Sequence, residues 1–171
     1  MGTSHVRASA DPADGRRHQS SHIGAFVRRT SVYVAWLQAM VATLGSLYFS
    51  EIRQFPPCSL CWYQRILMYP LTVILTVGIL RRDPALRWYA LPLSVGGLLV
   101  ATYHCLLTYN VIAAELAPCM QGVSCLTRWI NWFGFITIPL LAWVAFLVIT
   151  LTVSVAMLSE EDLNETTDDA A

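Results

Sequence analysis

Four long runs of apolar residues, separated by short polar segments, dominate the pattern of this chain. They cover residues 31–49, 62–80, 88–109 and 130–158. Each is long enough to cross a membrane as a helix, because about 20 helical residues span the roughly 30 Å hydrocarbon core. Barrel strands would alternate in polarity, and these runs do not. The pattern therefore predicts an all-α integral membrane protein, a four-helix bundle lying in the lipid bilayer.

Polar segments at both ends divide the chain further. Residues 1–30 have no apolar run and contain five arginines, whereas residues 159–171 are acidic. Sequences that bury little apolar surface do not support a packed fold. We predict a disordered tail at 1–30, a four-helix transmembrane domain at 31–158, and an acidic disordered tail at 159–171.

Charge is scarce and unevenly placed. Only 13% of the 171 residues are charged, against about 25% in soluble domains. Eight of the 11 basic residues, all arginines, lie in the first tail or near the connection between the second and third apolar runs. Arginine-rich connections stay in the cytoplasm. Both termini are therefore expected in the cytoplasm, with the other two connections outside. The chain has no basic, aromatic-rich surface of the kind that binds nucleic acid.

One of the two outer connections ends in a C-x-x-C pair, Cys58 and Cys61, at the start of the second apolar run. Arg65 follows Cys61 by one helical turn, so the two share a helix face. A helix N-terminus and a nearby cation both favour thiolate over thiol, and thiolate is the reactive form. The pattern predicts an exchangeable thiol pair with its thiolate at Cys61.

A second cysteine pair, Cys119 and Cys125, lies in the other outer connection. Two pairs on one oxidising face suggest a disulfide relay, although static disulfides remain possible for the second pair. The C-x-x-C lacks the following histidine of a haem attachment site. The spacing of the second pair is wider than usual for zinc. We expect no metal.

Residues 57–70 (PCSLCWYQRILMYP) resemble the signature of the disulfide bond formation protein B (DsbB) family, in particular its BdbC-type branch. Residues 130–139 (INWFGFITIP) are similar to the same branch. The resemblance extends over about residues 32–158 and implies a multi-pass protein of the bacterial cytoplasmic (inner) membrane. Family members are quinone reductases that reoxidise a thioredoxin-like periplasmic or extracellular thiol oxidase of the DsbA or BdbD kind.

The resemblance also implies roles for the four cysteines. Cys119 would form the mixed disulfide with the partner oxidase, and the freed Cys125 would reduce the Cys58–Cys61 disulfide. Cys58 would exchange with the loop pair, and Cys61 would lie beside the quinone. The electrons would then pass to the membrane pool of menaquinone or ubiquinone.

Two further residues are candidates for binding the quinone. Arg65 could hold a quinone carbonyl oxygen as charge builds on it, although an arginine here could also reach to the membrane interface. His104 should lie near the outer end of the third run, at the depth of Cys61. It could bond the quinone or pass on protons, or it could be a core histidine bonded to another helix.

Two alternative functions remain at this point. One is a quinone reductase like vitamin K epoxide reductase, in which the C-x-x-C follows the loop pair instead of preceding it. The other is a non-catalytic membrane adaptor with structural disulfides.

The fifth cysteine, Cys105, is expected to be a small apolar residue pointing away from the pair. Gly96 and Gly97 are expected to allow close helix packing.

Overall fold

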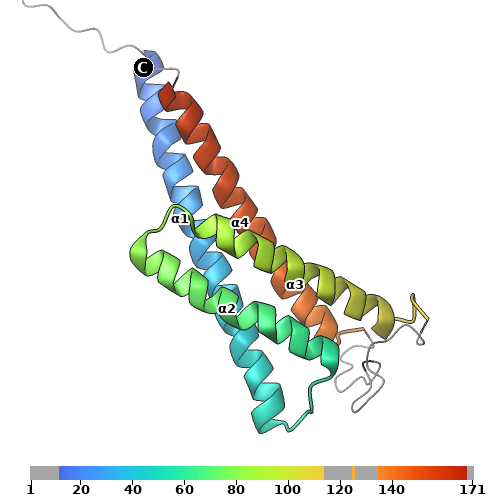
Figure 1. The fold of residues 1–171 in the computed structure, drawn as a ribbon. Helices are drawn as coiled ribbons and strands as arrows, with labels where there is room; N and C mark the ends of the chain where they lie inside the picture. The colour runs from blue at the N-terminus through green and yellow to red at the C-terminus, as the bar shows by residue number, and fades with distance from the viewer. Residues whose placement is uncertain (1–11, 114–124, 126–134, 169–171) are drawn as a thin grey trace, which may run out of the picture.

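Four long helices form the regular structure of the described part of the chain (Figure 1). The computed structural model describes residues 12–113, 125 and 135–168, with side chains for 24–113, 125 and 135–158. Helix α1 (Pro12–Leu47) continues into a short π-helix, η1 (Tyr48–Ile52). Helices α2 (Ser59–Arg81), α3 (Leu86–Thr108) and α4 (Ile138–Asp168) follow.

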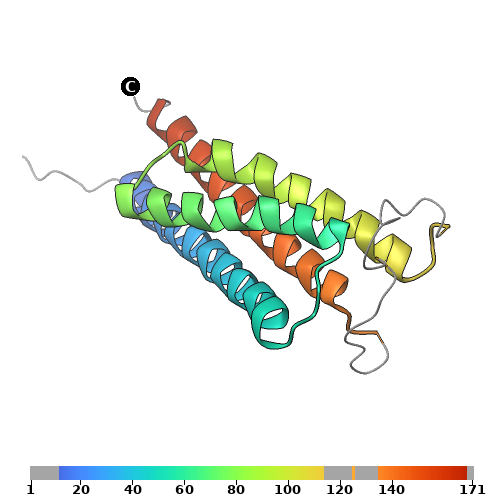
Figure 2. The same ribbon diagram turned by 60° about the horizontal axis from the view of Figure 1, so that its bottom comes forward.

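The helices pack in a closed ring, so that the first and last helices are neighbours (Figures 1 and 2). Helix α1 packs against α2 and α4, and α3 packs against the same two helices. Small and branched apolar side chains fill the centre, where all four helices contribute buried residues. These include Ala35, Ala39, Leu71, Leu75, Ala101, Phe146 and Ile149.

A glycine brings α3 and α4 together. A Cβ atom added at Gly97 would collide with the ring of Phe146, which is itself buried. The same atom at Gly96 would make only an ordinary contact, 3.9 Å from Leu67. The expected role in close helix packing is therefore confirmed for Gly97. At Gly96 a side chain with a Cβ atom would fit.

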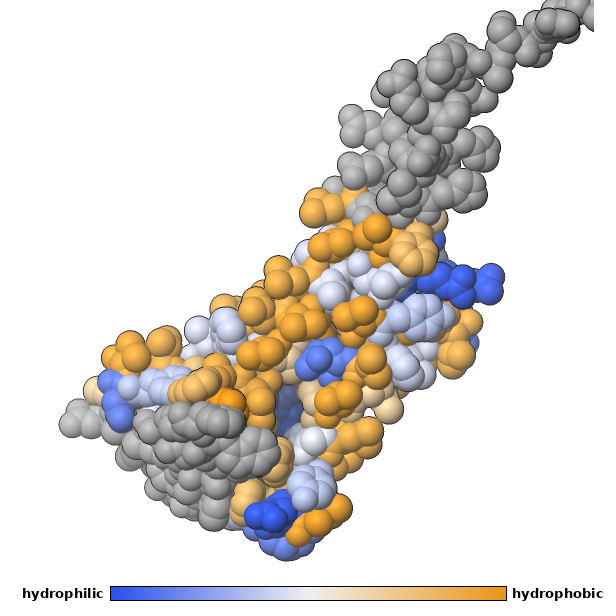
Figure 3. All heavy atoms as spheres, turned by 180° about the vertical axis from the view of Figure 1, so that it is seen from behind, coloured by the Kyte–Doolittle hydropathy of each residue, from blue (hydrophilic) through white to orange (hydrophobic). Residues whose placement is uncertain are grey.

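All four helices are long and apolar enough to cross a membrane. The spanning segments are Gly24–Ile52, Ser59–Arg81, Leu86–Thr108 and Ile138–Leu158. Large apolar side chains point outward along them, as hydrocarbon surroundings allow, and they colour much of the face in Figure 3. The prediction of an all-α, four-helix membrane bundle is confirmed.

The helix ends differ from the sequence prediction. Helix α1 already begins at Pro12, and α4 continues to Asp168, so parts of both predicted tails have a helical backbone. Adding residues to an existing helix costs little compared with starting one. The last span begins at Ile138 instead of residue 130, which puts Pro139 in the first turn, where its missing N–H is tolerated. The division into domains stays a prediction.

The segment between η1 and α2 folds back on itself and delivers the first cysteine. The rings of Phe49 and Phe55 stack with centroids 6.3 Å apart, and the Phe55 N–H donates to the Phe49 carbonyl. Gln54 allows this reversal with a left-handed backbone, at φ 55°. Two prolines follow and carry the chain to Cys58, which caps α2.

Candidate thiol redox site

Cys58 is the N-cap residue of α2, not a member of the helix. Its backbone is extended, at φ −74° and ψ 171°, and its Sγ accepts a hydrogen bond from the Cys61 N–H at 3.4 Å. This is the arrangement in which a cap satisfies one of the free N–H groups of a helix start. The helix field therefore acts mainly on Cys58, whereas the sequence predicted Cys61.

The two sulfurs of the C-x-x-C pair touch without being bonded. Their Sγ atoms are 2.9 Å apart and both thiols are free, whereas a disulfide would measure about 2.05 Å. Cys58 is buried, and Cys61 is partly exposed. The pair is therefore in its reduced form in this structure.

The surroundings of Cys58 favour its thiolate. The hydrogen bond from the Cys61 thiol has the largest effect and lowers the pKa of Cys58 from 9.0 to about 4, while burial opposes the shift. His104 and the Cys61 backbone N–H contribute smaller effects in the same direction. In the reduced pair, the hydrogen bond from the Cys61 thiol and the cap position thus favour a thiolate at Cys58. The thiolate predicted at Cys61 stays a prediction.

His104 joins three parts of the site. Its ring is 2% exposed, and its Nδ1 lies 3.2 Å from the Gln64 amide nitrogen. Its Nε2 lies 3.3 Å from the Cys125 carbonyl oxygen and 3.8 Å from the Cys58 Sγ. When the Gln64 amide donates to Nδ1, the ring proton must be on Nε2, facing the carbonyl and the sulfur. The position predicted for His104, near the cysteines, is where it lies.

Cys125 lies beside the C-x-x-C pair although the two are far apart in sequence. Its Sγ, the Cys58 Sγ and a ring nitrogen of His104 all lie within 4.8 Å of one another. Cys125 is buried and takes part in a disulfide. Cys119, its expected partner, lies outside the described residues.

The same three groups have the spacing of metal ligands, but their chemistry suits exchange better. A metal binds the deprotonated thiolate of a cysteine. The sulfur of Cys125 is held in a disulfide instead, so it has no such charge to offer while that bond persists. The cluster places one thiolate next to one disulfide sulfur, which is the arrangement that thiol–disulfide exchange requires.

Arg65 is anchored to α1. Its Nε donates to the Ser46 Oγ at 2.9 Å and its Nη2 donates to the Ser46 carbonyl at 3.1 Å. The guanidinium also lies over the ring of Trp62, 5.4 Å from the centroid. A guanidinium has five N–H donors, so further donors remain after these bonds. Ser46 thus holds Arg65 in place, in a partly buried position.

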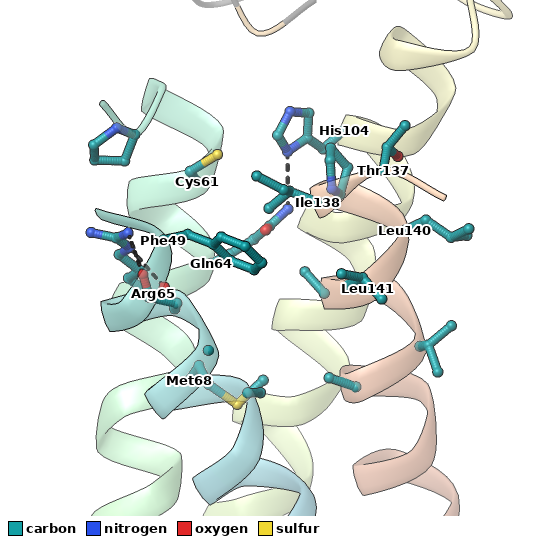
Figure 4. Close-up of a pocket in the computed structure, with 18 of the residues that line it drawn as sticks. Phe49, Cys61, Gln64, Arg65, Met68, His104, Thr137, Ile138, Leu140 and Leu141 are labelled. Carbon is teal, nitrogen blue, oxygen red and sulfur yellow. Dashed lines mark hydrogen bonds between the residues drawn. The ribbon is translucent and has the colours of Figure 1, made fainter. Parts of the chain in front are cut away.

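A cavity of about 560 Å³ adjoins the cysteine cluster and reaches all four helices. Figure 4 shows Cys61 and Arg65 on its α2 wall. Opposite them are Ile138 and Leu141 of α4, with Thr137 just before the helix begins. Figure 3 shows a hollow among apolar side chains on this side of the molecule. Its apolar lining includes Val41, Phe49, Met68, Ile138, Leu141, Val144 and Phe146. The cavity is of the size of small-molecule sites, about 300–1,000 Å³.

The donors in this cavity suit a quinone. On the α2 side, Arg65 lines the cavity and keeps N–H donors beyond its two bonds to Ser46. The cysteine cluster and His104 line the same cavity. The Thr137 hydroxyl on the opposite side is buried and has no hydrogen-bond partner among the described residues. A quinone is a flat apolar ring with carbonyl oxygens at opposite edges. A mainly apolar cavity with hydrogen-bond donors on facing walls therefore fits such a ring.

Three residues of the site had no role in the sequence prediction. Gln64 fixes the His104 ring, Ser46 fixes Arg65, and Thr137 lines the cavity. Gln64 lies inside the C-x-x-C helix and faces the bundle, since it is buried. A polar residue among apolar ones was its only signal in the sequence. Ser46 and Thr137 look like ordinary span residues until the helices pack.

Cys105 lies apart from the exchange cluster. Its thiol is free and partly buried, and it does not line the cavity. It is also absent from the group formed by Cys58, His104 and Cys125.

Comparisons with known proteins agree with this geometry. The family model for disulfide bond formation protein DsbB matches residues 28–158. Over 120 residues, 70% of this chain and 87% of the relative, the chain is 48% identical to disulfide bond formation protein C of Bacillus subtilis (strain 168). Probable disulfide formation protein C of Halalkalibacterium halodurans is 50% identical over 115 residues, which are 67% of this chain and 84% of that protein.

No solved structure matches the chain significantly. The family model, which covers residues 28–158, and the sequence relatives are thus the basis for its classification. With its paired cysteines at one end of a four-helix membrane bundle, this chain belongs to the DsbB family and is a membrane protein of disulfide bond formation.

Proposed function

We propose that this chain is a protein-disulfide:quinone oxidoreductase that reoxidises a thioredoxin-like thiol oxidase outside the cytoplasm. One observation carries the proposal: the sulfurs of Cys58 and Cys125 lie within 4.8 Å of each other, beside an apolar cavity that Cys61 also lines. Electrons from a protein dithiol can therefore reach the membrane interior through sulfur exchange alone.

Electrons enter at the loop pair. A thiolate of the reduced partner attacks Cys119, which breaks the Cys119–Cys125 disulfide, forms a mixed disulfide and releases Cys125 as a thiolate. The second thiol of the partner then attacks the mixed disulfide. The partner leaves with a disulfide, and Cys119 is released as a thiolate. The family resemblance supports Cys119 as the point of entry.

Exchange between the two pairs follows. The Cys125 thiolate attacks the Cys58 Sγ, breaks the Cys58–Cys61 disulfide and frees Cys61. Cys119 then attacks Cys125, restores the loop disulfide and releases Cys58. Thiols of low pKa are the better leaving groups, and Cys58 has such a pKa. A disulfide-bonded Cys125 beside free Cys58 and Cys61 is the arrangement expected after this step.

The electrons leave through the cavity. A bound quinone of the menaquinone or ubiquinone type accepts two electrons and two protons and leaves as the quinol. Cys61 lines the cavity and is the more exposed cysteine of the pair, and Arg65 offers a fixed cation for a carbonyl oxygen. His104 holds its Nε2 proton beside the Cys58 sulfur. These three groups are proposed to orient the quinone and to balance the charge.

We further propose that the cysteine end faces outside the bacterial inner membrane and that both termini are cytoplasmic. The arginine distribution supports this orientation. On intact cells, a membrane-impermeant thiol reagent would modify reduced Cys61, which is partly exposed. Labelling only after the membrane is opened would contradict the orientation.

A direct assay tests the function. Purified full-length chain would be mixed with a reduced thioredoxin-like oxidase and a soluble quinone, and quinone absorbance would be followed. We expect one quinone reduced for each disulfide formed in the oxidase. A non-catalytic adaptor would leave the quinone oxidised, and that result would reject the proposal. Membership of the DsbB family favours this function over that of a vitamin K epoxide reductase-like enzyme.

A further inference from the structure

A second cavity, of about 530 Å³, lies at the opposite end of the bundle from the cysteines. It is bounded by the early spanning turns of α1, the connection between α2 and α3, and the later turns of α4. Figure 2 shows this connection near the early turns of α1, away from the start of α2. The cavity shares no lining residue with the redox site.

Arginines from three separate segments converge on this cavity. Arg28 and Arg29 come from α1, Arg82 from the α2–α3 connection, and Arg87 from α3. The lining holds one acid, Asp83, whose carboxylate accepts a hydrogen bond from the Ala85 N–H at 2.8 Å. Among the described lining residues, four arginines and one aspartate make the lining mainly basic, and Arg29 and Arg82 reach it from different segments. Such a lining attracts an anion.

The backbone at Arg82 adds a second observation. Arg82 has a left-handed conformation, at φ 52°, and its N–H donates to the carbonyls of Gly78 and Ile79. Glycine is usually preferred at such a helix end, because a Cβ atom is disfavoured there. An arginine at this position gives the cavity a charge that glycine would not. Its neighbour Arg81 ends α2 and does not line the cavity.

The rest of the cavity is apolar and continues into the membrane-spanning part of the bundle. Val32, Leu75, Val153 and Ala156 line it, and all four lie within spanning segments. An inorganic anion has no apolar part that could pack against this surface. A molecule with an anionic head and a hydrocarbon tail would match both halves of the lining.

We propose that this cavity binds one anionic phospholipid, with its phosphate held by the arginines and an acyl chain against the apolar wall. Guanidinium groups bind phosphate through paired hydrogen bonds. The site would hold the lipid between α1, α3 and α4. The lipid would come from the membrane leaflet at this end of the bundle. The proposal is independent of the redox function.

Native mass spectrometry of the full chain tests this. The protein would be titrated with dioleoylphosphatidylglycerol or dioleoylphosphatidylcholine, and the first bound lipid would be quantified. We expect a clear preference for phosphatidylglycerol. Arg82→Gln should weaken its binding about fivefold, and Arg82→Gln with Arg87→Gln about thirtyfold, given about 1 kcal/mol for each arginine.

Arg81→Gln is the matched control, because it removes the same charge one residue away without touching the lining. It should leave binding within about twofold. An equal loss in Arg81→Gln, or equal binding of the two lipids, would overturn the proposal in favour of general surface charge. The pair Arg82→Lys and Arg87→Lys keeps the charge that sets topology. It should still bind more weakly than wild type, because lysine lacks the paired donors.

Two competing occupants are distinguished in the same experiment. Inorganic phosphate should not displace the lipid at equal concentration; displacement would indicate a free-phosphate site. A chain lacking residues 160–171, which contain six acids, should bind phosphatidylglycerol as wild type does. A large gain on truncation would show that the chain's own acidic end occupies the cavity, and would reject the lipid.

Discussion

The two ends of the bundle hold cavities of similar size, about 560 and 530 Å³, with opposite chemistry. At one end, thiols, a histidine and a single anchored arginine line an apolar space. At the other, four arginines surround the mouth. The same four helices build both, so the difference comes from a few polar residues at the helix ends. Both ends share the packed apolar middle of the bundle.

The ends also differ in how they are assembled. The redox site depends on contacts between residues distant in sequence, such as Gln64 with His104 and His104 with Cys125. At the arginine end, Arg82 and Arg87 are close in the chain, and only Arg28 and Arg29 come from a distant segment, α1. We therefore expect the redox end to be the more sensitive to single substitutions.

The largest expected effect is at the sulfur exchange itself. Cys58→Ser removes the sulfur that lies within 4.8 Å of the Cys125 sulfur. It should lower quinone reduction by at least about 1,000-fold, as for loss of a nucleophile in other enzymes. The measurement is steady-state quinone absorbance with a reduced partner oxidase. Cys105→Ser, outside the cavity, should keep normal turnover. Substantial activity in Cys58→Ser would show that electrons take another route.

Arg65 gives the next largest effect. Arg65→Ala should raise the KM for quinone about 10–100-fold, because a hydrogen bond from a charged group contributes about 1.5–3 kcal/mol. Exchange with the partner oxidase, measured by trapping the mixed disulfide, should change little. Arg53→Ala is a suitable control, since Arg53 lies at the same end without lining the cavity. An unchanged KM in Arg65→Ala would remove Arg65 from the quinone site.

A pH profile tests His104 as a positioning residue for Cys58. The pKa of Cys58 is depressed to about 4, so its thiolate should persist in the reduced protein well below neutral pH. His104→Phe removes one of the groups that lower this pKa, and the alkylation profile of Cys58 should therefore move to higher pH. Gln64→Leu removes only the hydrogen bond to the His104 ring. It should shift the alkylation profile of Cys58 less. Identical profiles in all three proteins would exclude this role.

The smallest effect concerns the packing of α3 against α4 in the middle of the bundle. Gly97→Ala places a methyl group against the Phe146 ring and should lower the free energy of unfolding by about 1–3 kcal/mol. Gly96→Ala, with open space, should be nearly neutral. Thermal unfolding of both variants in the same detergent measures this difference. Equal stability would mean that α3 and α4 pack less closely than the structure indicates.

The sequence was sufficient for the four spans and for locating the C-x-x-C pair. Hydrophobic length alone predicts membrane helices, because lipid offers no partner for an unpaired backbone. The C-x-x-C spacing is local, so Cys58 and Cys61 were identified without any tertiary information. The start of the last span was misplaced by the sequence, because residues 130–137 are apolar whether or not they are helical.

Only the tertiary structure decided which groups meet. Packing of α2 on α3 brings the His104 ring next to the Cys58 sulfur. Packing of α1 on α2 brings Ser46 within hydrogen-bond distance of the Arg65 guanidinium. The N-cap position of Cys58 brings a free N–H group of the helix start to its sulfur, which favours a thiolate there. Sequence patterns record which residues share a helix face. The distances between helices, and with them the electrostatics of each sulfur, depend on side-chain packing, which a linear pattern does not contain.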